Sequence, residues 1–392
     1  MAAFSFSRTP HIVFGCGSLA RLPELVNRFG SRLLLVTGTH ALCTSGKLQE
    51  ILAALRYVGV VVEHLTLAEE PSPQLVDEAV EALRPKAVQV VVAVGGGSAL
   101  DAGKAISAML PEEGSVAAFL EGIGDPERHS GGKVPFIAVP TTAGTGSEAT
   151  KNAVLTMRGP GGFKKSLRHE HFVPEVALVD PVLSCTCPPE LTAACGMDAF
   201  TQLLESYVST NASPLTDLLA VQGMERVRDC LERAVRDGAL DIQARDGMAY
   251  AALLSGLTLA NAGLGIVHGL AGPLGALAPI PHGVACGTLL ATATRMTIDS
   301  LRQADDARSR LALEKYGTVG ALLTGAEGDV LTQCRRLVDE LERWTVRFRI
   351  PRLGSFGLDE ALLREVARQG ENKNNPAALD QEQRLALLQE RL

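Results

Sequence analysis

Apolar runs alternate with amphipathic segments along the first half of the chain. Four runs have the composition of buried strands, namely residues 33–38, 60–67, 87–97 and 133–142. Between them, residues 45–57 and 73–83 repeat apolar positions at the spacing of a helix that buries one face. Strand and helix alternation of this kind predicts a mostly parallel sheet that is covered by helices on both faces.

The pattern changes near Asp180, after which strand signals nearly vanish and helical spacing continues to the end of the chain. We therefore predict an α/β domain over residues 1–184 and an all-helical domain over residues 185–392. From Gly247 to Thr294 there is no Asp, Glu, Lys or Arg. Because Gly, Ala, Pro and His interrupt this stretch, we interpret it as buried helices and a turn rather than as membrane spans.

Composition narrows the class of protein. A length of 392 residues favours two domains, and a net charge of −7 argues against binding to nucleic acid or to anionic membranes. The N-terminal residues lack the long apolar core of a signal peptide, and the eight cysteines show no disulfide-scaffold spacing. We expect reduced thiols and a cytoplasmic location.

A glycine-rich turn follows the third predicted strand, in the segment AVGGGSALDAGKA. Ser98 and Asp101 have the spacing of a helix capping box. Glycines that lead into a helix N-terminus suit a pyrophosphate, because free N–H groups and the helix dipole favour an anion. A tight turn between strand and helix explains the same residues equally well.

A second loop, PTTAGTGSEAT, follows the fourth predicted strand and is dense in hydroxyl side chains. The residues able to donate to phosphate or ribose oxygens are Thr141, Thr142, Thr145, Ser147 and Thr150. Two such loops, each at the carboxyl end of a strand, are typical of the crevice where open α/β sheets bind nucleotides. The common G-x-G-x-x-G motif is not present.

Candidate metal ligands lie in the helical half. Asp198 and Gln202 are four residues apart and share one face of a predicted helix. His268 and His282 lie in the charge-free stretch, each followed by Gly. One carboxylate and two imidazoles suit Zn²⁺ or non-haem Fe²⁺, although a single histidine in an apolar context is more often a core residue.

These motifs resemble the iron-containing (group III) alcohol dehydrogenases over nearly the whole chain. The resemblance is carried by residues 95–105, 140–150, 195–209, 265–276, 281–285 (PHGVA) and 372–376 (NKNNP). It implies a dehydroquinate synthase-like architecture, with an α/β dinucleotide-binding domain and an all-α domain that flank the active site. It also implies NAD or NADP, a divalent metal (Fe²⁺ or Zn²⁺), an alcohol or aldehyde substrate, and a homodimer or larger homo-oligomer.

By position, the resemblance assigns residues to two sites. Asp198, His268 and His282 are the expected catalytic residues and metal ligands, and Gln202 occupies the fourth ligand position. The expected cofactor-binding residues are Gly38, Gly96, Gly97, Ser98, Asp101, Thr141, Thr142, Thr145, Thr150 and Lys164.

Three positions depart from the family pattern. Gln202 stands where a histidine ligand is usual, and a neutral amide oxygen is the weaker ligand for such a metal. Gly272 stands where many members have a histidine that is proposed for proton transfer. Gly38 stands where NAD-selective members often have Asp, so a 2′-phosphate would not be repelled and NADPH becomes plausible.

The expected reaction is hydride transfer between a small alcohol and nicotinamide, with the metal acting as a Lewis acid on the substrate oxygen. Other readings stay open. These are a maleylacetate reductase-like or metal-free reductase, a lyase of the dehydroquinate synthase type that uses NAD transiently, and a non-catalytic nucleotide-binding protein. Gln202 and Gly272 are the residues that favour the last reading.

Overall fold

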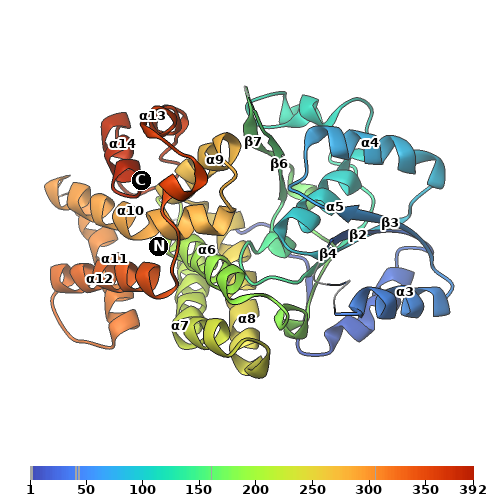
Figure 1. The fold of residues 1–392 in the computed structure, drawn as a ribbon, viewed down its shortest axis with the longest axis horizontal. Helices are drawn as coiled ribbons and strands as arrows, with labels where there is room; N and C mark the ends of the chain where they lie inside the picture. Colours follow the sequence, from blue (N-terminus) through green and yellow to red (C-terminus); the bar gives the residue numbers. More distant parts are fainter. Residues whose placement is uncertain (1–2, 40–41, 43–44, 160, 305) are drawn as a thin grey trace.

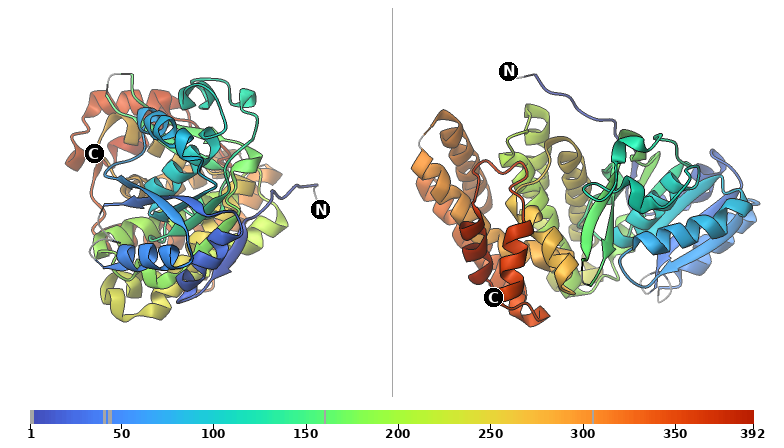
Figure 2. Two further views of the ribbon diagram at one scale, coloured as in Figure 1. Left: turned by 90° about the vertical axis from the view of Figure 1, so that its right-hand side faces the viewer. Right: turned by 90° about the horizontal axis from the view of Figure 1, so that it is seen from above.

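The computed structural model describes residues 3–39, 42, 45–159, 161–304 and 306–392. They form an α/β part and an all-helical part that lie side by side (Figure 1). The right-hand view of Figure 2 shows the same division from above. The last sheet strand ends at Val179 and the first long helix begins at Pro189, so the predicted boundary at residue 184 falls in the segment between them.

The α/β part contains a parallel sheet, which within the described residues has six strands in the order β1-β8-β5-β4-β2-β3. This arrangement confirms the predicted fold class. Four strands match the predicted runs, whereas β1 and β8 were not predicted from the pattern. The strands are β1 (His11–Phe14), β2 (Arg32–Gly38), β3 (Val61–Leu67), β4 (Val90–Gly95), β5 (Phe136–Pro140) and β8 (Val176–Val179).

Helices cover both faces of this sheet, because alternate side chains of each strand point to opposite faces. Leu34 and Val36 of β2 pack toward α4 (Pro73–Leu83) and α5 (Gly97–Met109). Leu33 and Leu35 pack toward the helices on the other face, α1 (Leu22–Asn27) and α3 (Lys47–Tyr57).

A separate antiparallel hairpin, β6 (Asn152–Met157) and β7 (Phe163–Arg168), lies between the sheet and the helical part. Its strand β7 contacts helix α9 of the helical part. The hairpin was not predicted from the sequence, because two lysines and an arginine in β7 obscure the apolar pattern. It places Lys164 next to the helical part.

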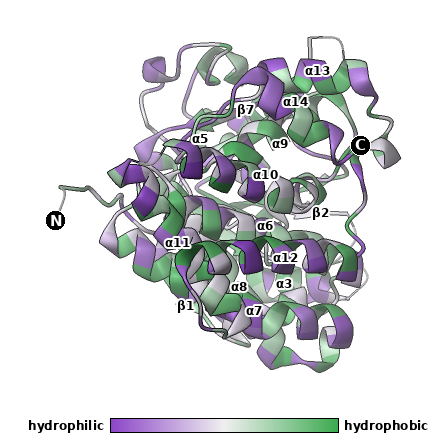
Figure 3. Cartoon of the chain, turned by 90° about the vertical axis from the view of Figure 1, so that its left-hand side faces the viewer, coloured by the Kyte–Doolittle hydropathy of each residue, from purple (hydrophilic) through white to green (hydrophobic). Residues whose placement is uncertain are grey.

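The helical part packs around one large apolar core. Figure 3 shows hydrophilic and hydrophobic residues interleaved around its outer helices, such as α7 and α12. Its helices are α6 (Pro189–Val208), α7 (Pro214–Asp237), α8 (Ile242–Ala262), α9 (Ile266–Leu277), α10 (His282–Ala304), α11 (Ala307–Thr324), α12 (Val330–Arg347), α13 (Glu360–Gln369) and α14 (Gln381–Gln389).

The charge-free stretch 247–294 forms most of α8, all of α9 and the first half of α10. Most of its side chains are buried, as the sequence predicted. Within the described chain, no single helix is long and apolar enough to cross a membrane. Helices α8 and α9 pass that test only as a pair, and the pair is bent by 101°.

Candidate metal and cofactor site

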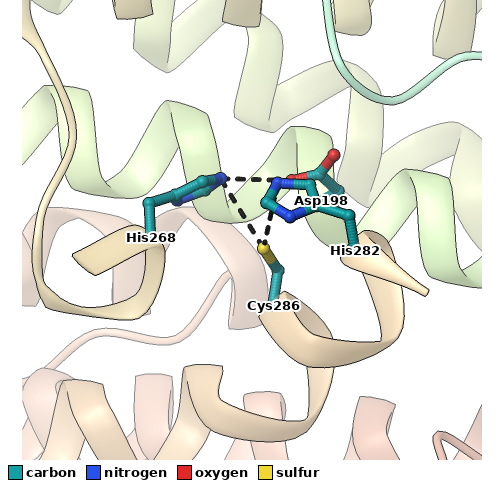
Figure 4. Close-up of side chains that lie close together, drawn as sticks. All are labelled: Asp198, His268, His282 and Cys286. Carbon is teal, nitrogen blue, oxygen red and sulfur yellow. Dashed lines mark hydrogen bonds and ion pairs between the residues drawn. The ribbon is translucent and has the colours of Figure 1, made fainter. Parts of the chain in front are cut away.

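Four side chains from three helices converge inside the helical part (Figure 4). Asp198 comes from α6, His268 from α9, and His282 and Cys286 from α10. Their ligand atoms all lie within 4.8 Å of one another. The three residues that the sequence predicted to meet therefore do meet, and a cysteine joins them.

Helical periodicity explains how the residues reach one place. Asp198, Gln202 and Glu205 are four and seven residues apart, so they follow one face of α6. His282 begins α10, and Cys286 lies one turn later on the same face. Two helices thus supply five of the groups in or beside the cluster, and His268 in the first turn of α9 completes it.

Glu205 fixes the orientation of His268. The Nδ1–H of His268 donates to Glu205 Oε2 over 2.7 Å, and the backbone N–H of Val267 donates to Oε1 over 2.6 Å. We assign the proton to Nδ1 from this bond with a carboxylate. Nε2 lies 3.3 Å from Asp198 Oδ1 and 3.6 Å from Cys286 Sγ. A histidine whose other nitrogen is held by a carboxylate is the usual arrangement of a metal ligand.

The electrostatics of the cluster favour a bound cation. Burial would raise the pKa of Asp198, but His282 and His268 outweigh that effect and lower it to about 2, so this carboxylate is ionised. Burial lowers the pKa of His282 to about 4, with partial opposition from Asp198, so its imidazole is neutral near pH 7. A carboxylate that stays charged and an imidazole with a free lone pair suit a divalent metal.

The donor set therefore fits the metal that the sequence predicted. One carboxylate and two imidazoles are a common ligand set for catalytic zinc and for non-haem iron. The side chains of Asp198 and His268 are only 3% and 5% exposed, whereas that of His282 is 29% exposed. His282 is thus the least covered of these three ligands.

Gln202 lies beside this cluster, although its amide oxygen is used elsewhere. Its Nε2 donates to Asp198 Oδ1 over 3.4 Å, and its Oε1 accepts a hydrogen bond from Ser255 Oγ over 3.1 Å. Ligation by Gln202 stays a prediction. Gly272, one turn after His268, has open space where a side chain would begin, with no atom within 4 Å.

The two predicted nucleotide loops lie against each other at the carboxyl edge of the sheet. Gly95 and Pro140, the last residues of β4 and β5, are paired across the strands. A Cβ on Gly97 would lie 2.8 Å from Thr145 Cγ2, and one on Gly96 would lie 3.4 Å from Thr142. A side chain at position 97 would therefore require Thr145 to shift, whereas the contact at Gly96 is an ordinary van der Waals distance.

Gly38 ends β2, the strand next to β4. The helices that follow these neighbouring strands, α3 and α5, pack on opposite faces of the sheet. Neighbouring strands whose helices diverge in this way open a crevice at their carboxyl ends, and open α/β sheets bind nucleotides there. Gly38, Gly96, Gly97 and Ser98 all lie at this edge.

The predicted capping box of Ser98 and Asp101 is wrong. Helix α5 begins at Gly97 with Gly96 as its N-cap, and no side chain caps it. Asp101 is used elsewhere, because its Oδ1 accepts a hydrogen bond from Ser147 Oγ and its Oδ2 accepts one from the Val154 N–H.

The second loop is held from beneath by the buried Lys104. Its Nζ donates to the hydroxyls of Ser147 and Thr150 and to the carbonyls of Ser147 and Asn152, over 2.8–3.1 Å. Thr141 is buried as well, and its N–H donates to the Gly95 carbonyl. These contacts indicate that Asp101, Thr141 and Thr150 shape the loop, whereas the half-buried Thr142 and Thr145 face the glycine turn.

Lys164 lies apart from the glycine turn. Its Nζ forms a 2.7 Å ion pair with Glu70, and a Cβ on Gly275 of α9 would lie 3.5 Å from the same Nζ. Lys164 and Glu70 also influence the pKa of His282 in opposite directions. Lys164 therefore lies where the α/β part faces the metal cluster.

Sequence reasoning missed Glu205, Cys286 and Lys104. Glu205 could have been found as the next residue on the face of Asp198 and Gln202. Cys286 could have been found from its spacing of four after His282, had the start of α10 at His282 been known. A lysine buried within a helix gives no such signal.

Two protein-family models match this chain. The family model for iron-containing alcohol dehydrogenases matches residues 9–181, and the model for the C-terminal part of the same family matches residues 192–392. The chain is 35% identical over 370 residues to long-chain-alcohol dehydrogenase 1 of Geobacillus thermodenitrificans, and this match covers 94% of this chain and 90% of the relative.

It is also 31% identical to the NADPH-dependent butanol dehydrogenase of Clostridium saccharobutylicum, over 91% of this chain and 87% of the relative. Among solved structures, an archaeal halo-thermophilic alcohol dehydrogenase from a Red Sea brine pool superimposes with a TM-score of 0.90 at 26% identity. The match covers 100% of this chain and 99% of that one. The chain therefore belongs to the iron-containing alcohol dehydrogenase family, whose members are NAD(P)-dependent oxidoreductases with a divalent metal held by the positions of Asp198, His268 and His282.

Proposed function

We propose that the protein catalyses reversible hydride transfer between a small alcohol, or its aldehyde, and NAD(P). The observation that carries this proposal is the convergence of Asp198, His268 and His282 within one buried cluster, of which His282 is the most exposed member. The two loops at the carboxyl edge of the sheet supply the matching nucleotide site.

A divalent metal held by these residues would stabilise negative charge on the alcohol oxygen, and the nicotinamide would accept the hydride. The chain's own residues prepare this step. Asp198 stays ionised and offsets positive charge at the cluster. Glu205 holds His268 in one tautomer. The close approach of the glycine turn to Thr145 supports a cofactor site between the two loops.

Gly38 supports acceptance of NADP(H). It ends β2 without a side chain, so no carboxylate stands there to repel a 2′-phosphate. The relative from Clostridium saccharobutylicum, which matches most of the chain, is named as NADPH-dependent. We infer that NADPH binds at least as well as NADH, and a comparison of the two cofactors at equal concentration tests this.

The function is tested by following NAD(P)H absorbance with a panel of small primary alcohols and aldehydes. His282→Ala should reduce kcat/KM by at least 100-fold, because it removes a ligand from the exposed side of the cluster. His11→Ala, at an exposed histidine in β1, is the matched control. Full activity of His282→Ala would refute the metal assignment.

The same panel separates the other readings. Product formation without net change of the cofactor would indicate a lyase, and cofactor binding without turnover would indicate a binding protein. Homo-oligomerisation and a cytoplasmic location stay predictions. Light scattering after size-exclusion chromatography and cell fractionation test them.

A further inference from the structure

We propose that Cys286 is the fourth protein ligand of the metal and that Gln202 is a positioning residue, so that a thiolate replaces an imidazole or amide in the site and favours zinc over iron. This inference rests on the proposed metal site. It assigns a role to a cysteine that the sequence pattern did not single out, and it removes that role from Gln202.

The distances within the cluster match a tetrahedral centre. With bonds of about 2.0 Å to nitrogen and oxygen and 2.3 Å to sulfur, such a centre separates N from O by about 3.3 Å and N from S by about 3.6 Å. Cys286 Sγ lies 3.6 Å from His268 Nε2 and 3.7 Å from His282 Nε2. Asp198 Oδ1 lies 3.3 Å and 3.8 Å from the same two nitrogens.

These four separations are of the size expected between the ligands of one tetrahedral metal, and the other ligand-atom separations in the cluster are also within 4.8 Å. Figure 4 shows the four side chains pointing toward a common centre. A thiol that only filled space in the core would not need to face two imidazole nitrogens at nearly equal distances. In the metal-free chain these contacts are hydrogen bonds of the thiol, and the same position lets the sulfur serve as a ligand once its proton is lost.

Gln202 is oriented for a different task. Its amide N–H donates to Asp198 Oδ1, and the Ser255 hydroxyl holds its oxygen on the opposite side. Turning the amide over would bring its oxygen against the ionised carboxylate of Asp198, which is unfavourable. Gln202 thus steadies a ligand and does not need to bind the metal itself.

A thiolate changes the chemistry of the site in two ways. Sulfur is a soft ligand and favours Zn²⁺ over harder divalent cations. Together, the charges of Asp198 and Cys286 neutralise a dication, whereas one carboxylate with neutral ligands would leave a net charge of +1. On binding, the S–H bond breaks, a sulfur–metal bond forms, and the proton passes to solvent.

Access to the metal remains possible with four protein ligands. Cys286 is fully buried, whereas the side chain of His282 is 29% exposed. Cys286 thus lies on the core side of the cluster and His282 on its less covered side, and catalytic zinc sites can accept a fifth ligand.

Cobalt spectroscopy on the full-length protein tests the ligand set without relying on activity. The metal is removed with a chelator and Co²⁺ is titrated into the wild type, Cys286→Ser and Gln202→Ala. Cys230→Ser, at a buried cysteine of α7 outside the cluster, is the control. A cobalt–thiolate bond gives a charge-transfer band in the near ultraviolet, and competition with Zn²⁺ and Fe²⁺ reports selectivity.

We expect the wild type, Gln202→Ala and Cys230→Ser to show the thiolate band. Cys286→Ser should lack it and should bind Zn²⁺ at least tenfold more weakly, with a smaller preference for Zn²⁺ over Fe²⁺. Cobalt bound to the wild type without the band would overturn the proposal even if Cys286→Ser fails to fold. A band that survives in Cys286→Ser would overturn it as well.

The outcome is independent of the proposed function. Steady NAD(P)H turnover by a protein without the thiolate band would leave the dehydrogenase assignment standing and refute the ligand assignment. A clear thiolate band in a protein that turns over no alcohol or aldehyde would support the ligand assignment and refute the dehydrogenase assignment.

Discussion

Glu205 offers a sharp test of how the site is organised, because one buried carboxylate orients a metal-binding histidine. Its two oxygens accept hydrogen bonds from His268 Nδ1 and from the Val267 N–H. In Glu205→Gln the single amide oxygen can serve only one of these donors. The amide NH₂ then faces the other donor, and a buried N–H loses its partner.

The expected magnitude follows from these contacts. A hydrogen bond to a charged group contributes about 1.5–3 kcal/mol, so we expect the metal-free variant to lose stability in that range. Disruption of a group that orients a metal-binding histidine weakens metal affinity by about 10- to 100-fold. The Kd for Zn²⁺ should therefore rise by one to two orders of magnitude, and kcat should fall at subsaturating metal.

Competition with a chromophoric chelator measures the Kd for Zn²⁺, and thermal unfolding of the metal-free protein measures stability. Glu190→Gln, at an exposed position in the first turn of the same helix, controls for the loss of one negative charge. A Kd for Zn²⁺ within twofold of the wild type in a folded Glu205→Gln protein would show that His268 does not depend on Glu205.

Three further changes test other parts of the structure. Gly97→Ala places a Cβ 2.8 Å from Thr145, so the Kd for NAD(P)H measured by fluorescence should rise about tenfold. Gly272→Ala is the control, because its Cβ enters open space and should leave this Kd unchanged. Gly38→Asp should raise the ratio of NADH to NADPH activity at least tenfold in steady-state assays, and an unchanged ratio would place the ribose elsewhere. Burial raises the pKa of Glu148 from 4.5 to about 7, partly offset by Lys104. Because the folded state favours the protonated form of Glu148, this group stabilises the fold fully below pH 4.5. The stabilisation declines as the pH rises and is lost above pH 7. The size of this stabilisation is on the order of 3 kcal/mol. The free energy of unfolding measured in urea should therefore change less with pH across this window for Glu148→Gln than for the wild type. Parallel curves of unfolding free energy against pH would contradict the assignment.

The parts of the fold that the sequence predicted are those with an uninterrupted apolar pattern. Strands β2, β4 and β5 are buried on both faces and appear as continuous apolar runs. Strand β3 lies at the edge of the sheet, where most of its side chains are exposed or half-buried, and Glu63 and His64 interrupt its apolar run. Strand β8 has four residues, and β7 carries charges, so neither gives a clear pattern.

At the site, the sequence predicted which side chains could bind a metal better than it predicted which side chains contact one another. Asp198, His268 and His282 stood out as polar residues in apolar segments. Asp101 was misassigned to a cap because its partners, Ser147 and Val154, are 46 and 53 residues away in the chain. Cys286 was not singled out from the other cysteines, and only the meeting of three helices shows what it faces.

The charge-free stretch of α8, α9 and α10 has a consequence for folding. In the native protein these helices are covered by their neighbours, but in a newly made or heated chain, 48 consecutive residues (247–294) carry no Asp, Glu, Lys or Arg. No charge repulsion then opposes association between unfolded copies, and charges that flank apolar segments are what normally limits aggregation. Two histidines and the cysteine of the metal cluster lie in this stretch, so early metal capture would also draw its helices together before they can associate with another chain.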